Sequence, residues 1–191
     1  MNSIRKRMAL LGLIATLLAC GGSPEKSSVA ATSDQGSSVE DTATNLKKRA
    51  QEVKQELCSQ FPQDLVLGYN PSAKKLEIEP IDDGNGGILD CKLKLFFGDK
   101  EHEFFEGLIS ASVSHNPERP FWQYDPSRNP NLYQTVDGVG EKAVYITNIR
   151  QLLVLKEGLI YYVAPPSNSY VADSGKETKQ LAIEIAKHFN L

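Results

Sequence analysis

The stretch KAVYITNIRQLLVLKEGLIYYVA, residues 142–164, decides the fold class. Apolar and β-branched residues dominate it, and two short polar segments, 148–150 and 157–158, interrupt it. Short apolar runs between turn residues are typical of β-strands joined by hairpins. The stretch therefore predicts three strands in a meander, at about Lys142–Thr147, Leu152–Lys156 and Leu159–Ala164.

A further hairpin is expected upstream of this meander. Residues 91–97 alternate in the way that is typical of a half-buried strand. One side would carry Cys91, Leu93, Leu95 and Phe97, and the other Lys92, Lys94 and Phe96. Residues 98–100 then turn the chain into another strand region at about 103–115. Two shorter strands are expected before the hairpin, around Leu65–Tyr69 and Leu76–Glu79.

An amphipathic helix is expected on each side of the strands. The first carries apolar residues at spacings of three and four and ends before Pro62: Leu46, Ala50, Val53, Leu57 and Phe61. The last follows a capping box at Ser174–Glu177 and would bury Leu181, Ala182, Ile185 and Phe189. The predicted class is α+β, with residues 44–191 forming one domain in which an antiparallel sheet of about five to seven strands packs against N- and C-terminal helices.

The start of the chain has the features of an export signal. Residues 1–7 are basic, and the apolar stretch 8–19 is shorter than the roughly 20 residues that span a bilayer. It ends in Leu17-Leu18-Ala19-Cys20-Gly21, which resembles the lipobox of bacterial lipoproteins. The resemblance implies that residues 1–19 are a signal peptide and that Cys20 is acylated. The alternative is an ordinary signal peptide followed by an incidental cysteine.

Residues 20–43 are predicted to be a lipidated cysteine and a disordered tether. They are rich in Ser, Thr, Ala and Gly and have little to bury, so they cannot offset the entropy of ordering. The expected location is the cell envelope. Cys20 is followed by Gly21 and not by Asp, which in a Gram-negative host implies the outer membrane by resemblance to sorting signals. In other hosts the anchor would lie in the outer face of the cytoplasmic membrane.

Charge narrows the classes of partner. The formal net charge is −3, and removal of residues 1–19 would leave about −6. Binding to nucleic acid depends on clustered basic side chains, which an acidic domain of this kind lacks. Nucleic acid is therefore not an expected partner, and the membrane is expected to be reached through the lipid on Cys20.

The cysteines predict one covalent bridge. If Cys20 carries lipid, Cys58 and Cys91 remain as an even pair in an oxidising compartment, where disulfides persist. The alternative is two buried free thiols. Neither cysteine belongs to a CxxC pair or has a neighbouring histidine, so the pattern does not indicate metal or redox chemistry.

A family resemblance supports the same architecture. The segment Val136–Ala143, VDGVGEKA, followed by a strand, the turn Lys156-Glu157-Gly158, another strand and a last helix, resembles small exported bacterial lipoproteins. Those proteins share a Gly-x-Gly-Asp/Glu-x-Ala turn with extracellular sensor domains of some mycobacterial kinases. The resemblance implies a PsbP-like fold, an antiparallel sheet with helices packed against it, and a role in binding a ligand or partner. It also matches the helix and strand that carry Cys58 and Cys91.

The sequence contains no motif for catalysis, a cofactor or a metal. Residues 138–142 lack the spacing of a phosphate-binding loop, and residues 82–94 lack the ligand pattern of an EF-hand. His102, His115 and His188 have no nucleophile elbow to accompany them. We therefore expect a protein that is not an enzyme and that has no cofactor and no metal site.

The 117–136 loop is the one candidate binding site. Four prolines fix φ and stiffen it, and four aromatic residues crowd it: Phe121, Trp122, Tyr124 and Tyr133. In an extended chain Trp122 and Tyr124 would face the same side and could stack on a flat ligand. The alternative is that the rings tuck under the loop and cover the sheet.

Three hypotheses for function follow. The first is an envelope lipoprotein whose non-catalytic domain binds an envelope protein, a glycan or a small ligand. The second is a structural or assembly accessory of the envelope, which would have no concave site. The third is an envelope hydrolase, which would need acidic or His/Ser groups brought together by the fold.

Overall fold

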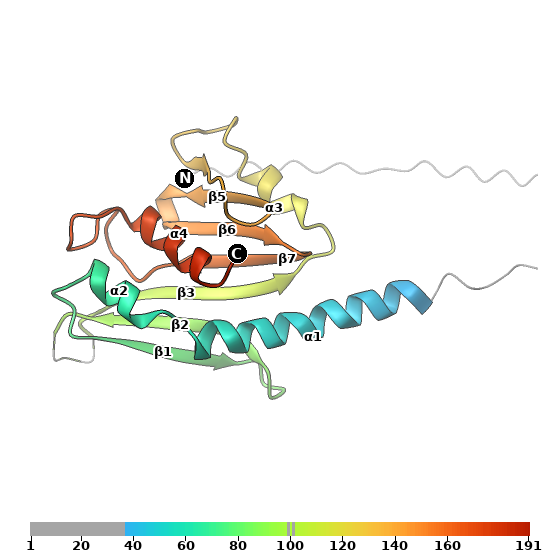
Figure 1. Cartoon of the computed structure of the whole chain (residues 1–191), viewed down its shortest axis with the longest axis horizontal. Helices are drawn as coiled ribbons and strands as arrows, with labels where there is room; N and C mark the ends of the chain where they lie inside the picture. Colours follow the sequence, from blue (N-terminus) through green and yellow to red (C-terminus); the bar gives the residue numbers. More distant parts are fainter. Residues whose placement is uncertain (1–36, 99, 101) are drawn as a thin grey trace, which may run out of the picture. The chain divides into compact units, whose positions relative to one another are not determined.

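A seven-stranded antiparallel sheet forms the centre of the domain in the computed structural model, which describes residues 37–98, 100 and 102–191. The strands follow the order β1-β2-β3-β7-β6-β5-β4 across the sheet (Figure 1). Their bounds are β1 Lys75–Asp82, β2 Ile88–Phe96, β3 Phe104–Val113, β4 Tyr133–Thr135, β5 Lys142–Ile146, β6 Gln151–Lys156 and β7 Leu159–Ala164. The helices are α1 Ser37–Ser59, α2 Gln63–Tyr69, α3 Glu118–Gln123 and α4 Thr178–His188, with a short 3-10 turn at Thr147–Ile149.

The sheet consists of two meanders joined side by side. Strands β1, β2 and β3 form the first, and β4, β5, β6 and β7 form the second. They meet where β3 pairs with β7, from Leu108 opposite Ala164 to Val113 opposite Leu159. Between β3 and β4 the chain crosses to the far edge of the sheet through α3. The predicted α+β class and the antiparallel sheet are confirmed, and the meander over residues 142–164 forms as expected.

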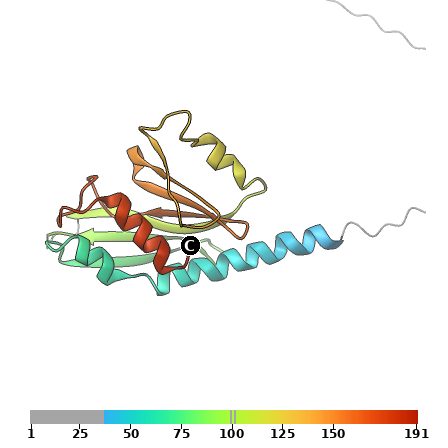
Figure 2. The ribbon, with the colours of Figure 1, turned by 45° about the horizontal axis from the view of Figure 1, so that its top comes forward.

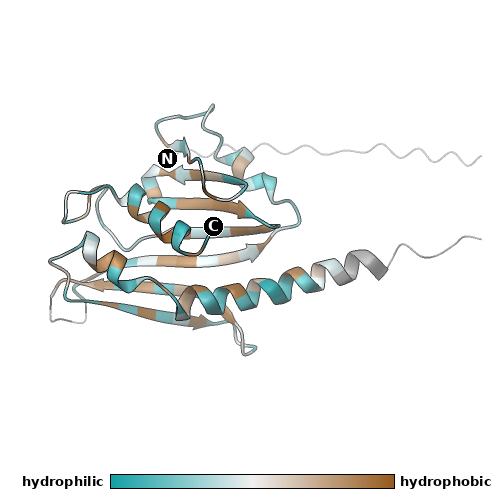
Figure 3. Cartoon of the chain, viewed as in Figure 1, coloured by the Kyte–Doolittle hydropathy of each residue, from teal (hydrophilic) through white to brown (hydrophobic). Residues whose placement is uncertain are grey.

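The main core lies between one face of the sheet and the helices α1, α2 and α4. Alternation along β2 directs Cys91, Leu93 and Leu95 into this core, as the sequence predicted. Apolar residues of the two long helices meet them: Ala50, Leu57, Phe61, Leu181, Ala182 and Ile185. Figure 3 shows the apolar residues concentrated along the central strands, while α1 carries mainly hydrophilic ones.

The opposite face of the sheet differs between the two meanders. On the β5 and β6 side it is apolar, with Val144, Ile146, Leu153 and Leu155 forming a second buried cluster. In Figure 2, α3 (yellow) and α4 (red) lie on different sides of these strands. On the β1–β3 side this face carries ion pairs between neighbouring strands instead: Lys94 with Glu79 and Lys92 with Glu106. The structure thus covers both faces of the second meander and only one face of the first.

One expected strand is a helix. Residues 65–69 belong to α2, whose Val66 and Tyr69 are buried at helical spacing. The Asn70 side chain donates a hydrogen bond to the Val66 carbonyl (2.9 Å) and closes the helix at its end. A five-residue apolar run cannot distinguish the helical period from a buried strand, which is why the sequence prediction was wrong.

The expected starts of both long helices also differ from the structure. Helix α1 begins at Ser37, inside the segment predicted to be a tether. The prediction placed its start too late, because the apolar spacing that indicates a helix begins only at Leu46. Helix α4 begins at Thr178, and no side chain caps it, so the predicted capping box at Ser174–Glu177 is wrong. Those residues form a tight turn in which the Ala172 N–H donates to the Lys176 carbonyl (2.8 Å).

The structure brings Cys58, near the end of α1, to disulfide distance from Cys91 on β2. Their Cα atoms are 5.5 Å apart, within the usual range for a disulfide, and the residues are 33 positions apart in the chain. Both side chains are buried in the main core. A bond here would link the first helix to the first meander.

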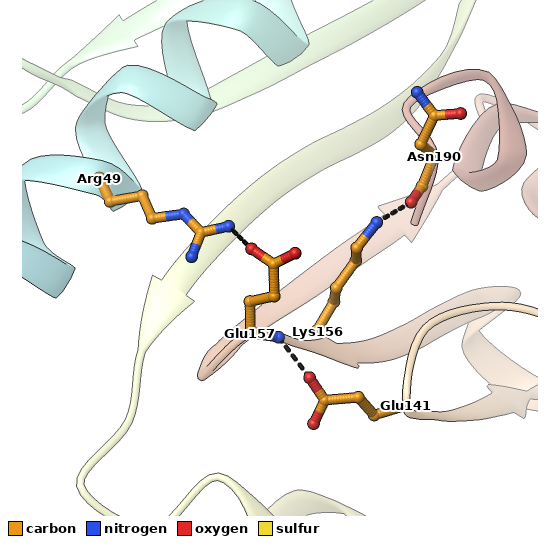
Figure 4. Close-up of polar contacts among 5 residues, drawn as sticks. All are labelled: Arg49, Glu141, Lys156, Glu157 and Asn190. Carbon is orange, nitrogen blue, oxygen red and sulfur yellow. Dashed lines mark hydrogen bonds and ion pairs between the residues drawn. The ribbon is translucent and has the colours of Figure 1, made fainter.

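The Gly-x-Gly-Glu segment has a structural explanation. Gly138 and Gly140 both have positive φ, 72° and 58°, and Val139 between them is buried. The next residue, Glu141, accepts a hydrogen bond from the Glu157 N–H in the β6–β7 turn (2.6 Å). Arg49 of α1 pairs with Glu157, and Lys156 donates to the Asn190 carbonyl (Figure 4). The segment therefore connects the start of β5 to this turn, and Glu157 connects the turn to α1.

Alanine at the two glycines should separate backbone strain from crowding. A Cβ at Gly138 would meet open space, so Gly138→Ala should cost about 1–2 kcal/mol for the left-handed conformation alone. A Cβ at Gly140 would collide with Val154 Cγ1 and the Leu155 carbonyl, so Gly140→Ala should cost about 1–3 kcal/mol more. Urea unfolding of the two variants measures both. Equal losses would contradict the packing described here.

The predicted signal peptide, Cys20 and residues 20–36 of the expected tether lie outside the described residues. Within the described part, no helix is both long enough and apolar enough to cross a membrane. Anchoring through Cys20 therefore stays a prediction.

Candidate binding site

Helix α3 builds the candidate site inside the segment expected to be an extended loop. Pro117 precedes its first residue, and Pro120 lies in its first turn. Proline is tolerated there because the first N–H groups of a helix have no partner within the helix. The prolines therefore stiffen this segment as a short helix, and the expected extended conformation is wrong.

Phe121 fixes α3 to the sheet. Its side chain is 4 % exposed and packs into the second cluster, against Val144, Ile146, Leu153 and Leu155. Tyr124 and Tyr133 pack at the edge of the same cluster, with their ring centroids 5.5 Å apart in an edge-on arrangement. These three rings cover the sheet, as the structural alternative for the loop expected.

Trp122 does the opposite and points into solvent. It is 66 % exposed, the largest exposed fraction among the exposed large apolar side chains of the described residues. The guanidinium carbon of Arg128 lies 4.7 Å from the ring centroid, at cation–π distance. Trp122 and Tyr124 do not share a face, because residues two apart on a helix point in nearly opposite directions. The prediction that Trp122 and Tyr124 stack side by side on a ligand is therefore wrong, and only Trp122 is exposed enough to do so.

A hollow of about 690 Å³ lies beside Trp122. This volume is within the range of small-ligand sites. Its walls combine aromatic and proline carbon with amide and charged groups: Asn116, Glu118, Arg119, Phe121, Trp122, Asp125, Pro126 and Lys142. The site thus has an apolar platform surrounded by hydrogen-bonding groups.

Three of the charged groups in the hollow are held by neighbours. Lys142 Nζ lies 2.8 Å from the Glu118 carboxylate, and it also stands 5.4 Å from the centre of the Phe121 ring. Asp125 accepts a hydrogen bond from the Ser127 N–H (2.8 Å), which lowers the pKa of its carboxyl below the ordinary value. Both carboxylates are therefore held in place by neighbouring donors.

Arg119 is the residue that the sequence analysis missed. It lies three positions before Trp122 in α3, so the two side chains lie on the same side of the helix. Its side chain is exposed and makes no hydrogen bond or ion pair with any residue that the structure describes. Helical spacing would have linked Arg119 to Trp122, but the prolines concealed the helix.

A second hollow, of about 580 Å³, lies on the charged side of the first meander. Its floor is the pair Phe96 and Phe104, with ring centroids 5.2 Å apart. Three of the four lysines that line it have acidic partners: Lys75 with Glu77, Lys94 with Glu79 and Lys100 with Glu103. The hollow beside Trp122 is the stronger candidate, because it combines the exposed indole with Arg119, whose side chain has no partner among the described residues.

The structure shows no metal-binding cluster within its described part. No group of three or more His, Cys, Asp or Glu side chains there is placed to hold a metal ion. His188 lies at the end of α4 with its Nε2 atom 3.2 Å from the Gln60 carbonyl.

Comparison with known protein families, with characterised proteins and with solved structures finds no significant match to this chain. The case for a function therefore depends on the sequence and on the site itself.

Proposed function

We propose that this chain is a lipoprotein of the bacterial cell envelope, anchored through a lipid on Cys20, whose domain binds a ligand without catalysing a reaction. The ligand site is the hollow beside Trp122. One observation carries the proposal: a tryptophan that is 66 % exposed stands on a helix fixed to the sheet by its buried neighbour Phe121.

The exposure of Trp122 favours a binding role for physical reasons. Tryptophan offers a large contact area with only two rotatable side-chain bonds and is enriched at binding hot spots. Because Phe121 anchors the same helix, little conformational freedom remains to be lost when a ligand binds. A helix whose only task was to cover the sheet would need Phe121 and would not need Trp122.

The finer fold assignment, a PsbP-like sandwich, is part of the same proposal. It is supported by the antiparallel sheet with helices α1, α2 and α4 on one face and α3 on the other. The resemblance of the Val136–Ala143 segment, which here fastens β5 to the β6–β7 turn, points the same way.

Cys20→Ser tests the anchor. The variant lacks the thiol that would carry the lipid, so it should move from the membrane fraction to the soluble fraction of its host. Fractionation followed by immunoblotting measures the change, with Ser23→Ala as a control that retains Cys20 and leaves the Cys58–Cys91 pair intact. A Cys20→Ser variant that stays with the membrane would show that the anchor is something else.

Trp122→Ala tests the site. Since the ring is mainly in solvent, the substitution should cost less than about 1 kcal/mol of stability. Capture of envelope components by the tagged protein, quantified by mass spectrometry, should be lost. The matched control is Tyr170→Ala, because Tyr170 is also exposed and also has an arginine, Arg150, over its ring. Unchanged capture by Trp122→Ala would favour the structural-accessory hypothesis.

A further inference from the structure

We propose that the hollow beside Trp122 binds an acidic saccharide, with a sugar ring on the indole and its carboxylate on Arg119. This inference deepens the proposed function and rests on it. Three features of the hollow carry it: the indole platform, the uncompensated charge of Arg119 and the fixed acceptors around them.

The indole supplies a flat apolar platform at an exposed position. Arg128 lies at cation–π distance from the ring, yet Trp122 is 66 % exposed, so much of its surface remains available to a ligand. The face of a pyranose ring that carries axial C–H groups is flat and apolar, and it suits such a surface. The cation–π contact with Arg128 keeps the indole of Trp122 in place.

The charges in and beside the hollow favour an anion with one negative charge, because Arg119, Lys142 and Arg128 are positive and Glu118 and Asp125 are negative. Glu118 and Lys142 neutralise each other, and Asp125 lies near Arg128, which contributes to its lowered pKa. Arg119 is left with its donors unmatched by any described residue. Guanidinium binds carboxylate through two parallel hydrogen bonds, which gives both energy and orientation.

The remaining polar groups favour hydroxyl partners over a second anionic group. The carboxylates of Glu118 and Asp125 accept hydrogen bonds and repel further negative charge, and Asn116 can donate or accept. A phosphate dianion would meet two carboxylates close to Arg119. A purely apolar chain would leave the guanidinium donors of Arg119 without partners and would therefore bind less well.

Intrinsic fluorescence tests the inference directly, because Trp122 is the single tryptophan of the chain. The probes are trigalacturonic acid and its neutral counterpart, a galactose trimer, titrated into the full-length protein in detergent. The acidic trimer should quench or shift the emission with saturable binding, and the neutral trimer should bind at least about tenfold more weakly.

Variants of Arg119 separate charge from geometry. Arg119→Gln should weaken binding of the acidic trimer by about tenfold or more and should leave binding of the neutral trimer unchanged. Arg119→Lys should give an intermediate loss, because lysine keeps the charge and lacks the paired donors. Arg150→Gln, in the turn between β5 and β6, is the control and should bind the acidic trimer normally. Thermal melting confirms that each variant is folded.

Three results would overturn the inference: equal affinity for the two trimers, unchanged binding of the acidic trimer by Arg119→Gln, or no saturable binding of the acidic trimer up to about 10 mM. These outcomes are distinguishable from failure of the proposed function. If Trp122→Ala still abolishes capture of envelope components while the acidic trimer fails to bind, the site binds a different chemistry. If capture is also unaffected, the site itself is refuted.

Discussion

Replacing Phe121 with alanine is expected to lower the free energy of unfolding by about 3–5 kcal/mol. The ring is the part of α3 that enters the sheet, and it fills the second cluster against Val144, Ile146, Leu153 and Leu155. Removing it leaves a cavity over the second meander and releases the helix that carries Trp122. Equilibrium unfolding in urea, followed by circular dichroism, measures the loss.

Two controls sharpen this result. Phe121→Leu keeps most of the volume and should cost less than about 1.5 kcal/mol. Trp122→Ala removes a larger ring from the adjacent position and should cost less than about 1 kcal/mol, because that ring is in solvent. If Trp122→Ala proved as costly as Phe121→Ala, Trp122 would belong to the core and could not be the platform of a binding site.

Loss of a Cys58–Cys91 bond should have a comparable effect. The loop that it would close spans 33 positions, for which the chain-entropy argument gives about 3–4 kcal/mol. Both sulfurs lie in the main core, so the double variant Cys58→Ala, Cys91→Ala also loses apolar contacts. The variant should unfold at a clearly lower urea concentration than the oxidised protein.

Chemical mapping distinguishes the bond from two packed thiols. Proteolysis without reductant should yield one peptide that contains both Cys58 and Cys91. The alternative of two free thiols predicts that both cysteines are labelled by a thiol reagent when the oxidised protein is unfolded without reductant. Such labelling would contradict the disulfide.

The elements that the sequence predicted well are those with a sustained pattern. Alternation over Cys91–Phe97 and the long apolar stretch 142–164 set which side of each strand is buried, and both gave strands. The apolar run at residues 65–69 was too short to reveal its period, so a strand was predicted where the structure has α2. The pairing of β3 with β7 leaves no mark in local spacing, so the order of the sheet required the structure.

The site was predicted only in part, for a similar reason. Composition pointed to the segment that lines the hollow, because aromatic residues crowd it. Which ring is buried depends on the direction of each residue around α3, and the prolines argued against a helix. Once α3 is known, Phe121 and Trp122 separate into anchor and platform, and Arg119 comes beside Trp122.

The seam between the two meanders has a consequence for how the chain reaches its native state. Each meander is made of neighbouring segments, and hairpins of that kind form within microseconds. The pairing of Leu108 with Ala164 must instead bring together segments separated by α3 and by three strands. Contacts so distant in sequence are slow to form, because the entropy of closing the intervening chain is lost before they stabilise anything. We therefore expect the pairing of β3 with β7 to form more slowly than the hairpins within each meander.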